Sequence, residues 1–91
     1  MDVLYAITET RLVKKEGWDL YGFMGSRVIL ISDSLQECKK ALRSYVKEHY
    51  GMTVKIQVQD DDDLEYFEAE ISPTPNRIVQ FVAQPFLKSK I

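Results

Sequence analysis

The sequence predicts an α+β domain, in which one antiparallel sheet of about five or six strands carries a single helix on one face. One segment, at about residues 34–50, repeats its apolar residues every three or four positions, as an amphipathic helix does. The segments on both sides of it alternate apolar and polar residues, a pattern typical of antiparallel strands with one solvated face. A chain of 91 residues is expected to form one domain, residues 1–91, with the element order β-β-(β)-α-β-β-β.

Two or three strands are expected before the helix. Residues 3–13 are rich in β-forming residues, and Gly17 can take the positive φ angle of a hairpin turn. Residues 18–23 are expected to return as the second strand, after which Gly25 marks a bulge or a tight turn. Residues 27–31 form a short apolar run, which indicates a third and buried strand.

The helix has start and stop signals as well as periodicity. Ser34 and Glu37 form a capping box, in which the hydroxyl accepts from a backbone N–H and the carboxylate reaches back to the cap. Gly51 is placed to end the helix as the left-handed residue that follows it. The predicted apolar face consists of Leu35, Cys38, Leu42, Tyr45, Val46 and His49.

Three strands are expected after the helix. Residues 53–59 and 65–71 alternate with period two, and the four aspartates 60–63 are expected to join them as a loop. A second, proline-containing connection leads to a last strand at residues 77–83, which Pro85 is expected to break.

Composition indicates an intracellular, cytoplasmic protein that is not in a membrane. No apolar run approaches the ~20 residues that span a bilayer, and acidic Asp2 stands where a signal peptide is basic. A single cysteine, Cys38, excludes an internal disulfide. The sequence pI of about 5.3 argues against nucleic-acid binding by bulk charge alone.

The chain is not expected to be an enzyme or to hold a cofactor. His49, the one histidine, follows Cys38 by eleven residues, about 16 Å along a helix, so the two cannot form a catalytic pair within it. No cysteines and histidines have zinc spacing, and the aspartate run lacks the central glycine of a calcium-binding loop, so no metal site is predicted.

The strongest lead to a function is an acidic hairpin, residues 60–70. It contains seven of the 14 acidic residues and no basic one, whereas the rest of the chain has a net charge of +5. Alternate strand residues lie about 6.6–6.8 Å apart, so an acidic row has a spacing comparable to that of phosphates. We predict that it binds a basic surface of a larger protein, although it could serve only to keep a sheet edge soluble. The predicted contact residues are Asp60, Asp61, Asp62, Asp63, Glu65, Tyr66, Glu68 and Glu70.

Two alternatives remain open. A small nucleic-acid or nucleotide-binding module would hold phosphates with basic residues of the helix and one arginine near the glycines. These residues are Arg27, Lys39, Lys40, Arg43 and Lys47. A homodimer formed by pairing exposed sheet edges is compatible with either function.

The chain resembles, in style rather than by a diagnostic motif, small accessory proteins of phages and mobile elements, including anti-CRISPR proteins. The resemblance consists of its size, the sheet with one helix, the helix start at residues 34–41 and the acidic hairpin. It implies an intracellular inhibitor that blocks the nucleic-acid-binding surface of a host-defence protein, and it transfers no site residues.

Overall fold

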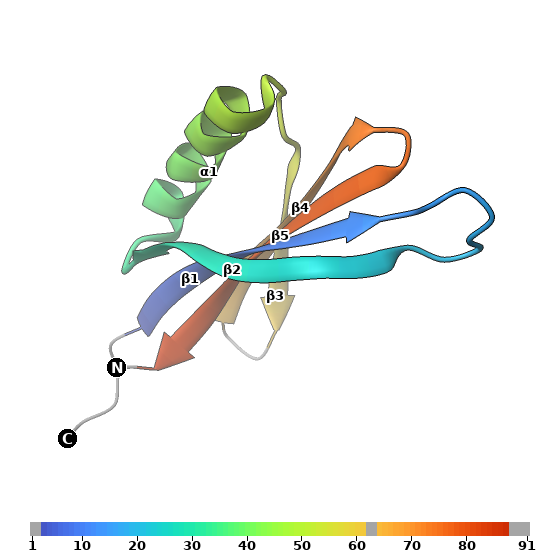
Figure 1. Ribbon diagram of the computed structural model, residues 1–91. Helices are drawn as coiled ribbons and strands as arrows, with labels where there is room; N and C mark the ends of the chain where they lie inside the picture. The colour runs from blue at the N-terminus through green and yellow to red at the C-terminus, as the bar shows by residue number, and fades with distance from the viewer. Residues whose placement is uncertain (1–2, 62–63, 88–91) are drawn as a thin grey trace.

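A computed structural model describes residues 3–61 and 64–87 (Figure 1). Five antiparallel strands form one sheet in the order β2-β1-β5-β4-β3, and a single helix links β2 to β3. The predicted α+β class is confirmed, with five strands in the described part of the chain. The elements are β1 (Val3–Val13), β2 (Gly22–Ser32), α1 (Leu35–Tyr50), β3 (Ile56–Asp61), β4 (Leu64–Thr74) and β5 (Arg77–Leu87).

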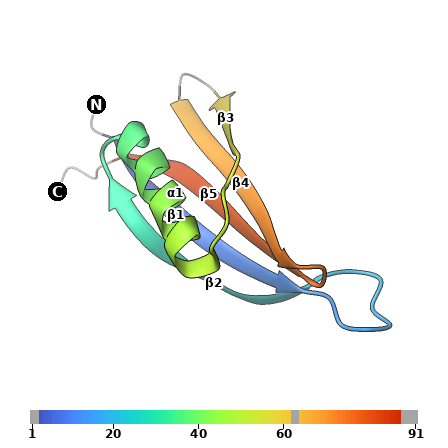
Figure 2. The same ribbon diagram turned by 90° about the horizontal axis from the view of Figure 1, so that it is seen from above.

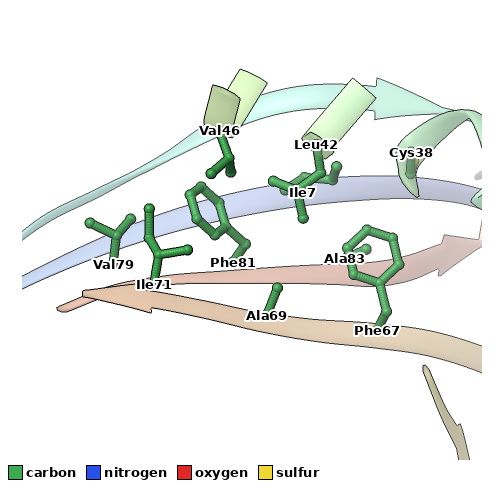
Figure 3. Close-up of a cluster of buried hydrophobic side chains, with 10 residues drawn as sticks. All are labelled: Ile7, Cys38, Leu42, Val46, Phe67, Ala69, Ile71, Val79, Phe81 and Ala83. Atoms are coloured by element: carbon green, nitrogen blue, oxygen red, sulfur yellow. The ribbon is translucent and has the colours of Figure 1, made fainter. Parts of the chain in front are cut away.

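The core lies between α1 and one face of the sheet. Figure 2 shows, from above, α1 lying across the sheet. The helix contributes Cys38, Leu42 and Val46, which are fully buried and point toward the strands (Figure 3). Their spacing of four residues is the one that the amphipathic pattern predicts. The sheet contributes residues from β1, β4 and β5: Ile7, Phe67, Ala69, Ile71, Val79, Phe81 and Ala83.

Both ends of α1 are capped. The Glu37 N–H donates to Ser34 Oγ at 3.3 Å, and Gly51, at φ 65°, donates its N–H to the Lys47 carbonyl. The reciprocal half of the predicted capping box is replaced, because the Ser34 N–H donates instead to Ser32 Oγ at 3.1 Å. The serine two residues earlier therefore satisfies the donor that the Glu37 carboxylate was expected to reach.

The predicted second and third strands are one strand, β2, which begins at Gly22 rather than at Trp18. Two bulges interrupt its pairing with β1, and Gly25, at φ 151°, adopts a conformation that favours glycine. The prediction of a buried strand is wrong because β2 lies at the edge of the sheet, where Val28 and Ile31 are exposed.

Pro85 does not end the last strand. β5 continues beside β1 as far as the pair Val3↔Leu87, whereas its recorded pairing with β4 reaches only Phe67↔Ala83. Pro85 has no backbone N–H, but it lies where β5 has a neighbouring strand on one side only, a position at which a strand tolerates proline.

β3 ends and β4 begins at the end of the sheet where β1 begins, and the β1–β2 and β4–β5 connections lie at the other end. Two hydrogen bonds tie these last two connections together: Lys14 N–H to the Asn76 carbonyl at 2.8 Å, and the Tyr21 hydroxyl to the Pro75 carbonyl at 3.3 Å. Within residues 3–61 and 64–87, no helix is long and apolar enough to cross a membrane.

Candidate functional site

One face of the sheet is covered by α1, and we call the opposite one the open face. The strand β2 places Phe23, Val28 and Ile31 on it, with exposed fractions of 69%, 56% and 61%. These residues pair across the sheet with Leu12, Thr8 and Ala6 of β1. Their spacing of five and three positions does not alternate, but the two bulges rotate the strand so that all three share one face.

The acidic part of the open face comes from β4. Glu68 and Glu70 are exposed and alternate with the buried Phe67, Ala69 and Ile71, so they point away from the helix. The Glu70 carboxylate accepts a hydrogen bond at 3.2 Å from the amide of the β5 residue Gln80. Tyr66 also alternates toward this face, where it is half-buried.

The acidic hairpin does not form one continuous charged row. Asp60 and Glu65 pair with each other and share the face of Phe67, which is the side that α1 covers further along the sheet. Asp60 and Asp61 belong to β3 rather than to a loop, while the predicted contact residues Asp62 and Asp63 lie outside the described residues. Strand alternation therefore divides the described carboxylates between two faces.

The predicted phosphate-binding residues lie on two different elements. Lys40, Arg43 and Lys47 are exposed on the side of α1 that faces away from the core, and Lys39 beside them is half-buried. Arg27 lies on β2, where its guanidinium is engaged by an acidic residue.

That acidic residue is Glu9, which sequence reasoning missed. Its side chain is 0% exposed, and Arg27 Nε contacts Oε1 at 3.1 Å. The hydroxyls of Tyr45 and Tyr50 donate to Oε2 at 2.8 and 3.0 Å. The available signal was strand alternation, which places Glu9 on the core side with Ile7.

The Glu9 network is closed on itself. Arg27 also donates to the Tyr45 hydroxyl at 2.8 Å, and its hydrogen bonds to Tyr45 and Glu9 raise the arginine pKa. A buried carboxylate with three donors, one of them cationic, is a charge that the fold can hold without a ligand. We interpret the network as a device that fixes α1 on β1 and β2.

Stability should fall with pH between about 10 and 12. Burial, followed by the hydrogen bond to Glu9, raises the pKa of Tyr50 from 10.0 to about 12. In this window the unfolded chain has lost a proton that the folded chain retains, so unfolding is favoured as the pH rises. Melting temperatures measured from pH 9 to 12 should fall less steeply in Tyr50→Phe, which has no such proton. Equal slopes in the two proteins would contradict this assignment.

Cys38 and His49, the side chains most suited to catalysis, both pack against other parts of the fold. Cys38 is fully buried, and burial raises the pKa of its thiol, which disfavours the nucleophilic thiolate. His49 stacks on Tyr45, with ring centroids 4.3 Å apart. Among the described residues, no three His, Cys, Asp or Glu side chains are grouped as metal ligands.

Comparisons with protein-family models, curated proteins and solved structures found no match to this chain.

Proposed function

We propose that the protein is a non-enzymatic interaction domain that binds a larger protein through its open face. One observation carries this proposal: apolar and acidic side chains lie on a single cross-strand row. Register places Val28, Thr8, Val82, Glu68 and Gln57 side by side across all five strands. With strands about 4.8 Å apart, Val28 and Glu68 are about 14 Å apart, a distance that one partner surface can span.

The apolar end supports binding rather than simple solvation. Phe23, Val28 and Ile31 are each more than half exposed on one face of one strand. Soluble monomers seldom expose large contiguous apolar patches, and such patches commonly mark interaction sites.

The charged end favours a basic partner. Glu68 and Glu70 lie two residues apart on β4, about 6.6–6.8 Å, a spacing comparable to that of phosphates along a nucleic-acid strand. A partner surface that complements this pair would carry arginine or lysine beside apolar residues. We extend the proposal to an inhibitor, in phage anti-defence or a similar role, that blocks a nucleic-acid-binding surface.

Charge reversal on the open face should weaken binding. The change is Glu68→Lys with Glu70→Lys, and the matched control is Glu16→Lys with Glu48→Lys, an equal charge change at exposed positions on a loop and on α1. Tagged wild-type, variant and control proteins are used to capture partners from bacterial lysate, and each captured protein is purified and titrated by calorimetry. We expect a basic protein that binds wild type and control alike, weakens at least about tenfold with the variant, and is displaced by nucleic acid.

Equal affinity of the captured protein for variant and control would contradict the proposal. Recovery of nucleic acid alone, lost when Lys40 and Arg43 are replaced by glutamate, would favour the alternative phosphate-binding module instead. Concentration-dependent self-association that Val28→Asp prevents would favour the homodimer through sheet edges.

A further inference from the structure

A second site lies on the helix side of the sheet, past the last turn of α1. There β1, β4 and β5 continue beyond the helix and form the floor of a pocket of about 430 Å³. Its walls include His49 and Tyr50 from the helix, with Met24 from the edge strand. A volume of this size is within the usual range for small-molecule sites.

Two arginines from neighbouring strands line this pocket. Arg11 pairs with Val79, and Val13 pairs with Arg77, so the two arginines are diagonal neighbours on one face of β1 and β5. Such positions lie about 7–8 Å apart, within reach of long side chains. Both side chains line the same pocket, where an anion would meet two positive charges.

The protein does not neutralise this pair within its described residues. Across residues 3–61 and 64–87, the one ion pair joins Arg27 to Glu9. Glu9 lies two residues before Arg11 on the same face, but it already accepts from Arg27, Tyr45 and Tyr50. No acidic side chain lines the pocket. The charges of Arg11 and Arg77 are therefore available to a ligand.

The rest of the lining indicates what such a ligand carries besides charge. Val79, Met24 and Tyr50 supply apolar and aromatic surface beside the guanidinium groups. A phosphate monoester carries close to two negative charges and accepts forked hydrogen bonds from arginine. We infer that this pocket binds a small phosphate monoester with an apolar or aromatic body, held by Arg11 and Arg77.

The helix does not attract an anion to this pocket. Its C-terminal end lies at this pocket, and the carbonyl end of a helix carries partial negative charge. Attraction for an anion must therefore come from the two arginines. The two arginines of this site are separate from the open face, because Arg11 and Arg77 share the side of the sheet on which Glu9 and Val79 are buried.

Calorimetric titration of the full chain with adenosine monophosphate tests the inference, with adenosine and inorganic phosphate as partial ligands. Adenosine monophosphate should bind more tightly than either. The variant Arg11→Gln with Arg77→Gln should weaken binding at least about tenfold, since it removes two charge-assisted contacts. The control Lys15→Gln with Lys55→Gln, an equal charge change at exposed positions outside the pocket lining, should leave affinity unchanged.

Both arginines are exposed, so the variant is expected to fold, and its melting temperature without ligand checks this. Arg77→Lys, which keeps the charge and loses the fork, should give intermediate affinity. Equal weakening by variant and control would show non-specific attraction and overturn the inference. The inference would also be overturned if adenosine bound as tightly as the monophosphate, or if none of the three probes bound. Binding of a phosphoserine peptide without binding of adenosine monophosphate would overturn it as well.

Discussion

Replacing Phe67 with alanine should lower the free energy of unfolding by about 3–5 kcal/mol. Its ring is 0% exposed and lies in the core with Ile7, Cys38 and Ala83 (Figure 3). The neighbouring residues come from three different elements and can close the resulting cavity only in part. Domains of this kind are stable by about 5–15 kcal/mol in total, so this single change approaches the limit of folding. Urea unfolding at neutral pH measures the difference.

The control for this prediction is Phe23→Ala. That ring is 69% exposed on the open face, so its removal should change stability by no more than about 0.5 kcal/mol. A comparable loss for Phe23→Ala would contradict the description of β2 as an exposed edge. In that case, repeating the measurement at several protein concentrations would show whether a second copy buries the ring.

Replacing Glu9 with glutamine should lower the free energy of unfolding by about 1–3 kcal/mol. The change preserves the size of the side chain but removes its charge and one of its two acceptor oxygens. Arg27, Tyr45 and Tyr50 all donate to this carboxylate, so at least one donor loses its acceptor. Urea unfolding of the variant gives the loss, and a double-mutant cycle with Tyr50→Phe isolates the coupling between the two side chains.

Glu16→Gln is the matched control, because Glu16 is exposed in the β1–β2 connection. It should leave stability within about 0.5 kcal/mol of the wild type. A Glu9→Gln protein as stable as this control would mean that the buried carboxylate does not hold α1 in place. Replacing a buried ion pair can be neutral when the new groups pack well. This comparison therefore decides whether the Glu9 carboxylate stabilises the protein or contributes nothing to its stability.

The local signals of the sequence were sufficient to predict α1. Its period, the Ser34 cap and the Gly51 stop depend on residues within a few positions of one another. They were confirmed, except that His49, predicted on the apolar face, is exposed. The alternation in β4 was also sufficient, because it placed Phe67 inward and Glu68 outward before any partner strand was known. Interactions between residues of a single helix or strand can be predicted from their positions in the sequence.

The candidate sites depended more on tertiary structure. Only the two bulges bring Phe23, Val28 and Ile31 to one face, and bulges arise from pairing with β1. Pro85 was misjudged for a related reason, since its cost depends on which side of β5 has a neighbouring strand.

By itself, the sequence determined the fold class, the helix with both its ends, and the division of β4 into an inward and an outward face. Tertiary structure decided that Arg11 and Arg77 line one pocket, that Glu9 meets Tyr45, and that the acidic residues are divided between two faces. The physical reason is the separation along the sequence between the residues that interact. Periodicity and capping are satisfied along the chain, whereas a charge finds its partner across strands that are tens of residues apart in sequence, and only their register specifies which side chains meet.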